Sequence, residues 1–140
     1  MDQHAIFGPM LGTMLLTFVV WIYMYARRIP FIRGLELTPE QLTAVEFARI
    51  QPPAVINPSD NLKNLFELPT VFYGLVAYLY VTSQVDSVYL IAAWIFFAFR
   101  VLHSAVHCTV NVIMVRFWLY CISALALWFM LLRAAVAYFV

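Results

Sequence analysis

Six polar side chains lie inside stretches of sequence that are otherwise apolar and long enough to cross a lipid bilayer. They are Asn64, Glu67, Arg100, His103, His107 and Arg116. A charged side chain near the centre of a spanning helix costs about 2.5–3.5 kcal/mol on insertion scales, so such residues are usually kept for a function. Arginine offers paired contacts to carboxylates, which makes a small anionic ligand the first expectation for these residues.

The spacing of the polar residues predicts that they form stripes on three helices. Residues three, four or seven positions apart share one face of a helix. The three stripes are Arg100, His103 and His107; Asn64 and Glu67; and Arg116 and Tyr120. If the stripes converge, they line one pocket that opens toward one side of the membrane.

Depth estimates predict an ion pair between Glu67 and Arg100. With a rise of about 1.5 Å per residue, Glu67 lies roughly 14 Å and Arg100 roughly 16 Å from the same membrane surface. An unpaired charge at that depth is too costly, so the two should meet within one subunit or across an interface. Arg116 and Lys63 then leave the pocket electropositive, and Asp60 partly offsets this charge near its mouth.

The composition indicates an integral membrane protein. Of the 140 residues, 65% are hydrophobic and 11% are charged, whereas about 25% are charged in an average soluble domain. The net charge of +1 predicts neither a nucleic-acid partner nor an acidic one. Cys108 and Cys121 lie in apolar surroundings, and we expect buried free thiols rather than a disulfide.

Four apolar stretches reach the length of about 17–25 residues that a spanning helix needs. They cover about residues 5–26, 58–81, 88–108 and 112–139. The sequence therefore predicts an all-α, four-helix, up-and-down membrane bundle that forms a single domain over residues 1–140. The last two helices should form a tight hairpin, and Asp86 or Ser87 should cap the third.

The loop between the first two spans should hold one short helix. Thr38–Gln41 combines an N-cap, a proline at the first helical position and a capping-box glutamine, which predicts a helix from Pro39 to about Ile50. Pro52–Pro53 should end this helix. Asn57–Pro58 repeats the cap-and-proline signal and should open the second span.

Basic residues predict the orientation in the membrane. The first loop and its borders carry Arg27, Arg28, Arg33, Arg49 and Lys63, whereas residues 82–87 contain no Lys or Arg. By the positive-inside rule, the first loop and its short helix are cytoplasmic, and both termini lie on the opposite side.

Three short motifs resemble those of the MAPEG family, the membrane-associated proteins in eicosanoid and glutathione metabolism. Lys63–Glu67 resembles the family's basic-Asn-x-x-Glu motif, and Arg100–His103 resembles the Arg-x-x-His stretch of its third helix. Arg116–Tyr120 resembles the Arg-x-x-x-Tyr motif that begins its fourth helix. Among the members, the sequence looks most similar to the microsomal prostaglandin E synthase type.

The resemblance implies a homotrimer that binds glutathione between neighbouring subunits near the cytoplasmic side. It assigns the glutathione contacts to Lys63, Asn64, Glu67, His103, His107 and Tyr120. Arg116 matches the arginine that stabilises the glutathione thiolate, and a nearby cation lowers a thiol pKa from about 8.5. The thiolate would then attack a lipophilic electrophile or peroxide, so the implied function is a membrane glutathione transferase or peroxidase.

A second function stays open beside this one. Asp60 stands where many active members carry a further arginine, and His107 stands where they commonly carry a tyrosine. The family also includes a member that binds lipid without doing chemistry, so the alternative is a non-catalytic, trimeric lipid-binding or scaffold protein. A haem or metal site is not expected, because His103 and His107 share one helix face and cannot clamp opposite sides of one haem. A transporter is disfavoured because the four helices carry no internal repeat.

Overall fold

The computed structural model describes residues 2–36, 38 and 43–139. This part of the chain is almost entirely helical and contains no strand, which confirms the all-α prediction. In chain order the elements are the 3-10 helix η1 (Gln3–Ile6), α1 (Phe7–Arg33), α2 (Ala44–Ile50), α3 (Pro53–Asn64), α4 (Leu68–Val81), α5 (Ser87–Cys108) and α6 (Ile113–Phe139).

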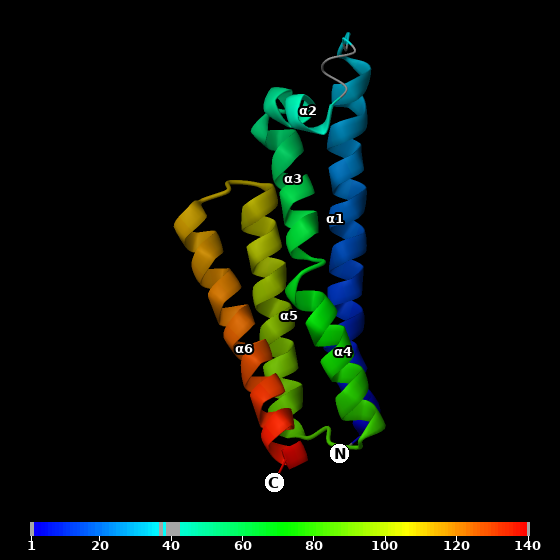
Figure 1. Cartoon of the computed structure of the whole chain (residues 1–140), viewed down its shortest axis with the longest axis vertical. Helices are drawn as coiled ribbons and strands as arrows, with labels where there is room; N and C mark the ends of the chain where they lie inside the picture. The colour runs from blue at the N-terminus through cyan, green and yellow to red at the C-terminus, as the bar shows by residue number, and fades with distance from the viewer. Residues whose placement is uncertain (1, 37, 39–42, 140) are drawn as a thin grey trace.

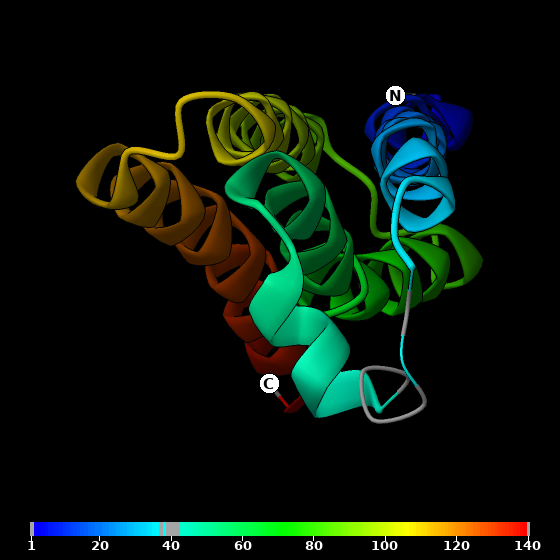
Figure 2. The same cartoon turned by 90° about the horizontal axis from the view of Figure 1, so that it is seen from above.

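Four helical segments are long and apolar enough to cross a membrane. They are Gln3–Arg33, Pro53–Val81, Ser87–Cys108 and Ile113–Phe139. The segments alternate in direction, so that η1 and the last turn of α6 lie at the same end of the bundle (Figure 1). α5 packs mainly against α6, α1 and α3, and α4 packs mainly against α1 and α6. Seen from above, α1 and α6 therefore stand on opposite sides of the bundle, with α5 and α3 between them (Figure 2).

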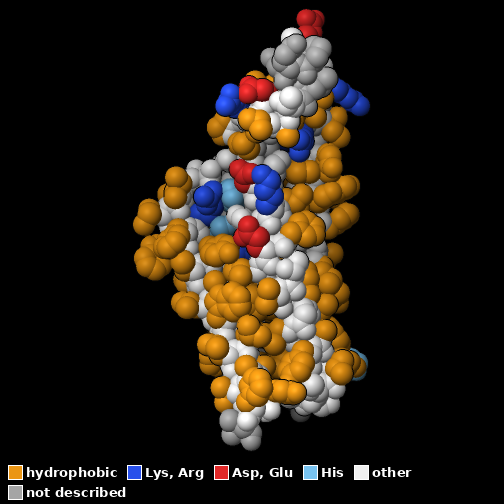
Figure 3. All heavy atoms as spheres, in the orientation of Figure 1, with side chains coloured by type: hydrophobic (Ala, Val, Ile, Leu, Met, Phe, Trp, Pro, Cys, Tyr) orange, Lys and Arg blue, Asp and Glu red, His pale blue; other side chains and the backbone are white. Residues whose placement is uncertain are grey.

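Large apolar side chains cover the outside of the bundle. Leu15 and Phe18 on α1, and Trp118 and Leu125 on α6, each expose more than half of their surface. Lipid tails solvate such side chains, whereas a water-soluble monomer rarely exposes apolar patches of this extent. On the face shown in Figure 3, charged side chains gather over the upper part, and the lower part is mainly hydrophobic.

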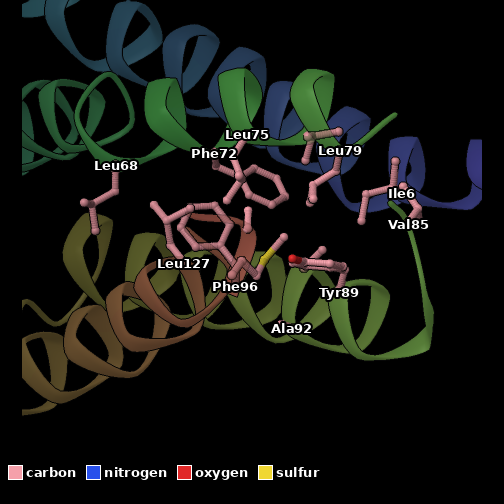
Figure 4. Close-up of a cluster of buried hydrophobic side chains, with 14 residues drawn as sticks. Ile6, Leu68, Phe72, Leu75, Leu79, Val85, Tyr89, Ala92, Phe96 and Leu127 are labelled. Carbon is pink, nitrogen blue, oxygen red and sulfur yellow. The ribbon is translucent and has the colours of Figure 1, made fainter. Parts of the chain in front are cut away.

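The apolar core lies in the half of the bundle that holds the two termini (Figure 4). Phe72 on α4 stacks on Phe96 on α5 with ring centroids 4.4 Å apart, and Leu127 on α6 and Ile6 on η1 belong to the same buried cluster. In lipid, helices associate mainly through close packing of this kind. The opposite half of the bundle is the one that holds the buried arginine and histidines.

α5 begins at Ser87 with Asp86 as its N-cap, which is one of the two residues that the sequence offered for this cap, and one residue before the predicted start. The Oδ1 atom of Asp86 accepts a hydrogen bond from the Tyr89 amide at 2.9 Å. Arg133 on α6 donates to both carboxylate oxygens of Asp86, at 2.8 and 2.5 Å, and its guanidinium lies 4.2 Å from the centre of the Tyr89 ring. One carboxylate therefore caps α5 and ties it to α6.

The second span is two helices rather than one, which corrects the prediction. α3 ends at Asn64 and α4 begins at Leu68, with a break at Leu65–Glu67. Pro69 explains the break, because a proline in a continuous helix has no N–H for the carbonyl of Leu65 and its ring clashes with that carbonyl. Helix formation also starts earlier than predicted, at Pro53, and Pro58 lies inside α3.

The first span and the loop helix also differ from their predicted bounds. α1 continues past Ala26 to Arg33, where Gly34 caps it, because a helix that leaves the bilayer can carry basic residues in water. α2 begins at Ala44, and the side chain of Thr43 accepts a hydrogen bond from the amide of Glu46 at 3.3 Å. The predicted start at residues 39–41 lies outside the described residues.

Candidate functional site

The break between α3 and α4 turns two polar residues toward the start of α6. Asn64 is the last residue of α3, and Glu67 is the N-cap of α4. Together with His103 on α5 and the first turns of α6, they line a pocket of about 260 Å³. Its lining residues are Asn64, Glu67, His103, Ile113, Arg116, Phe117 and Tyr120. Basic, acidic and histidine side chains gather there, between the upper part of α6 and helix α3 (Figure 3).

Five of the residues that the sequence singled out therefore share one pocket. They are Asn64, Glu67, His103, Arg116 and Tyr120. Arg116 and Asn64 are half-buried, whereas His103 is buried. The structure thus brings polar residues from three spans together, as predicted, although the stripe of Asn64 and Glu67 lies at a helix break.

Arg100 lies behind the pocket and is fully buried. Its Nη2 atom donates a hydrogen bond of 2.7 Å to the main-chain oxygen of Asn64, and its guanidinium lies 5.1 Å from the centre of the Tyr120 ring. The last carbonyls of a helix have no partner within the helix and carry partial negative charge, which a cation satisfies. Arg100 therefore serves as the cap for the broken end of α3.

The predicted ion pair between Glu67 and Arg100 does not form within the described chain. The Nε and Nη1 atoms of Arg100 are buried without a hydrogen-bond partner, and Nη2 bonds to a main-chain carbonyl instead. The helix break explains the difference, because it brings the end of α3, rather than a carboxylate, within reach of the guanidinium. Pairing across two subunits stays a prediction.

The two histidines occupy different positions. The Nδ1 atom of His103 lies 3.0 Å from the main-chain oxygen of Arg116. A carbonyl only accepts hydrogen bonds, so Nδ1 carries the proton, and Nε2 of the neutral ring is an acceptor. That Nε2 atom is buried without a partner. His107 is also buried but does not line the pocket, and its ring packs edge-on against His103 with centroids 5.5 Å apart.

Arg116 is held by an amide rather than by a carboxylate. Its Nη1 atom donates a hydrogen bond of 2.8 Å to Oδ1 of Asn111, in the turn between α5 and α6. The Nδ2 atom of Asn111 in turn donates to Oδ1 of Asn57 on α3, at 3.1 Å. The sequence predicted only a helix cap at Asn57 and no role for Asn111. The only signal in the sequence was an asparagine at a tight turn, a residue type that tolerates left-handed backbone.

Lys63 is not among the residues that line the pocket. Its Nζ atom pairs with Oδ1 of Asp60, one turn earlier on α3, at 2.9 Å, and its side chain is 75% exposed. The sequence predicted that Asp60 would partly offset the positive charge near the mouth of the pocket. In the structure Asp60 pairs with Lys63, and neither residue lines the pocket. A contact from Lys63 to a ligand would require this exposed pair to open.

A buried polar cluster fixes α3 against α5 beside the pocket. The Nδ2 atom of Asn61 lies 3.4 Å from the Cys108 sulfur, and Ser104 donates to Oδ1 of Asn61 at 3.4 Å. Cys108 and Cys121 are both free and half-buried. In the described parts of the chain, no group of three or more His, Cys, Asp or Glu side chains could hold a metal ion.

The geometry can be compared with known proteins at this point. The sequence matches the sequence model of the MAPEG family over residues 6–136, which is nearly the whole chain. The chain belongs to the MAPEG family. Comparison with curated proteins and comparison with solved structures each gave no match. MAPEG members are glutathione-related transferases and peroxidases or non-catalytic proteins, and their four-helix membrane fold agrees with the bundle described above.

Proposed function

We propose that this MAPEG protein is a membrane-bound, glutathione-dependent transferase or peroxidase that acts on lipophilic electrophiles. The observation that carries the proposal is the pocket in which Asn64, Glu67, His103 and Tyr120 surround Arg116. Glutathione has carboxylates, an ammonium group, amides and a thiol. Arg116 offers a cation, Glu67 a carboxylate for the ammonium group, and the other side chains offer hydrogen bonds.

The size of the pocket supports a site that is shared between subunits. At about 260 Å³, it is smaller than the roughly 300–1,000 Å³ of a typical small-molecule site. A neighbouring subunit would complete it, in agreement with the homotrimer that the MAPEG resemblance implies.

Arg116 is the residue that we assign to the chemistry. A guanidinium next to the ligand sulfur stabilises the thiolate and lowers the thiol pKa. In the transferase reaction, the thiolate sulfur forms a bond to an electrophilic carbon, and the leaving group takes the electron pair of the bond that breaks. As a peroxidase, the sulfur attacks a hydroperoxide oxygen, the O–O bond breaks and an alcohol leaves; a second thiol then reduces the sulfenic acid to a disulfide and water.

The test is a titration of the purified protein in lipid nanodiscs with glutathione, followed by ultraviolet absorbance of the thiolate. The wild type should form thiolate near neutral pH, and Arg116→Ala should bind the thiol but form at least about tenfold less thiolate, which corresponds to one pKa unit. Arg116→Lys, which keeps the charge, is the matched control and should retain part of the signal. A wild type that neither binds glutathione nor forms thiolate would end the enzyme proposal.

A second candidate function rests on a separate apolar pocket. This pocket of about 440 Å³ lies between α4 and α6, and its lining includes Val71, Gly74, Leu131 and Tyr138. It could hold an aliphatic chain, which suits a non-catalytic lipid-binding protein. Native mass spectrometry of the protein released from membranes would detect a retained lipid. Lipid retention together with no thiolate signal would favour this function over the enzyme.

A further inference from the structure

The turn between α5 and α6 lies beside the pocket. Asn111 has a backbone φ of +47°, in the left-handed region, and its amide nitrogen donates to the carbonyl of Val106 at 2.8 Å. Asparagine is one of the few non-glycine residues that enter this region readily. The conformation points its side chain toward both α3 and α6, where it contacts Asn57 and Arg116.

The direction of each hydrogen bond in this chain is fixed by chemistry. A guanidinium can only donate, so the atom of Asn111 that faces Arg116 must be Oδ1. Its Nδ2 group must then face Asn57, and it donates to Oδ1 of that residue. The three side chains therefore form a one-way relay from Arg116 through Asn111 to Asn57, which links α6, the turn and α3.

A second contact fixes the main chain of Arg116. His103 donates from Nδ1 to the carbonyl oxygen of Arg116 at 3.0 Å. The guanidinium and the backbone of this residue are thus both restrained by neutral groups. Within the described chain, no carboxylate forms an ion pair with Arg116.

We infer that Asn111 is a positioning residue that aims the Arg116 guanidinium into the pocket while leaving its positive charge uncompensated. This inference rests on the proposed function. An aspartate in the same place would hold the guanidinium equally well, but it would neutralise the charge on which stabilisation of a bound thiolate depends. Asn57 supports Asn111 from α3, so the aim of the guanidinium depends on the packing of α3 against the turn.

The first arm of the test needs no thiol. Solid-state NMR of the ¹⁵N-arginine-labelled protein in bilayers should show a guanidinium with hindered rotation, assigned to Arg116 by its absence from Arg116→Lys. Asn111→Gly keeps the left-handed backbone and removes the side chain, so that signal should be lost. Ser83→Gly is the matched control, because Ser83 also has a positive φ, of 56°, but lies in the turn between α4 and α5. A hindered signal that survives in Asn111→Gly would overturn the inference, whatever the protein binds.

The second arm measures the thiolate. In Asn111→Gly, thiolate formation and kcat should fall about tenfold, the effect of losing one hydrogen bond to a charged group, while KM for glutathione changes less than about threefold. Asn111→Asp keeps the acceptor for Arg116, and the Asn57 amide can turn so that its NH2 group donates to the new carboxylate. A purely structural role therefore predicts wild-type behaviour, whereas a charge-preserving role predicts a loss at least as large. Wild-type thiolate formation in both variants would reject the inference and leave the proposed function standing.

Other charged and titratable groups also face Arg116. Glu67 from α4, His103 from α5 and Tyr120 from α6 line the same pocket. Arg100 and His107 lie behind it, and Asp60 on α3 is paired with Lys63. None of these groups is changed in the Asn111 variants, so a shift between variants and wild type reports on Asn111. If the wild type forms no thiolate at all, the proposed function fails, and the NMR arm still decides whether Asn111 positions Arg116.

Discussion

Buried polar side chains in this protein bond mainly to main-chain carbonyls rather than to one another. Arg100 donates to the carbonyl of Asn64, His103 to that of Arg116, and Thr13 to that of Pro9. In lipid, every free backbone group needs a partner from the protein, because water is not available. Among these three carbonyls, that of Asn64 lies at the end of a helix, so Arg100 both borders the pocket and compensates for irregular backbone.

The link between Asp86 and Arg133 yields a prediction on stability. The partly exposed ion pair should be worth no more than about 1 kcal/mol. Asp86→Asn keeps an N-cap and loses only the ion pair, so its free energy of unfolding should fall by about that amount or less. Asp86→Ala also loses the cap, which should cost about 1 kcal/mol more. Thermal unfolding of the wild type and both variants in detergent measures the contributions of the ion pair and of the cap. Equal stability of the two variants would show that the cap contributes nothing.

The same carboxylate predicts a dependence of stability on pH. The Arg133 guanidinium holds the pKa of Asp86 at about 2, below its usual value of 3.8. A carboxyl with a lowered pKa in the folded state contributes its stability above pH 3.8, and the contribution is lost as the pH falls toward 2. The wild type should therefore approach the stability of Asp86→Asn between about pH 4 and pH 2. A constant difference between the two across this window would contradict the assignment.

At this scale the sequence predicted five of the residues that share the pocket, but it placed Lys63 and His107 there as well and predicted an ion pair between Glu67 and Arg100 that does not form within the described chain. Helical spacing was enough to bring Asn64, His103 and Arg116 toward one pocket, because the depth of a residue in a spanning helix follows from its position. The hydrogen bonds from Arg116 to Asn111 and from Asn111 to Asn57 were not predictable. They depend on the left-handed turn and on how closely α3 approaches it.

Among the helices, the break between α3 and α4 does most to shape the site. The amide of Phe66 donates to the carbonyl of Lys63 at 2.9 Å, whereas in a continuous helix the amide of Glu67 would donate to that carbonyl. Pro69 then prevents the helix from continuing. Both Asn64 and Glu67 line the pocket as a result, on either side of the break.

Pro69→Ala tests this account. The substitution restores an N–H for the carbonyl of Leu65, so α3 and α4 should join, and hydrogen exchange at the Glu67 amide should slow by at least about tenfold. Glutathione affinity should fall, because Asn64 and Glu67 turn with the straightened helix. Pro58→Ala is the matched control, since Pro58 lies within the unbroken part of α3. Unchanged exchange at Glu67 in Pro69→Ala would show that Pro69 does not cause the break.

Helix bounds were predictable where one local signal stood alone. The Asp86 cap placed the start of α5 to within a residue, whereas two pairs that contain proline, Pro52–Pro53 and Asn57–Pro58, competed for the start of the second span. The first pair opens the helix, and the second is tolerated in its second turn. The break could not be read from the apolar run, which continues on both sides of it.

For the whole molecule, the distribution of charge predicts the orientation in the membrane. Arg27, Arg28 and Arg33 lie at the end of α1 next to α2, and residues 82–87 at the other end hold no Lys or Arg. In a chain without Cys108 and Cys121, a cysteine at Glu36 should react with an impermeant maleimide only from the cytoplasmic side. A cysteine at Ser83 should react only from the opposite side. The reverse pattern would overturn the orientation.

The length of α1 has a consequence for how the protein sits in membranes of different thickness. From Arg27 to Arg33 the helix rises about 10 Å beyond its uncharged stretch, and α2 is fastened there by Phe47, which lies 5.2 Å from the Arg28 guanidinium. These basic residues and α2 should stay in the water and headgroup region, so they should fix the depth of the bundle in the membrane at the end nearer the polar pocket. In a thinner or thicker bilayer, the mismatch should then fall at the opposite, apolar end of the bundle, which holds the two termini. The distance from the pocket to the nearer headgroups should stay the same.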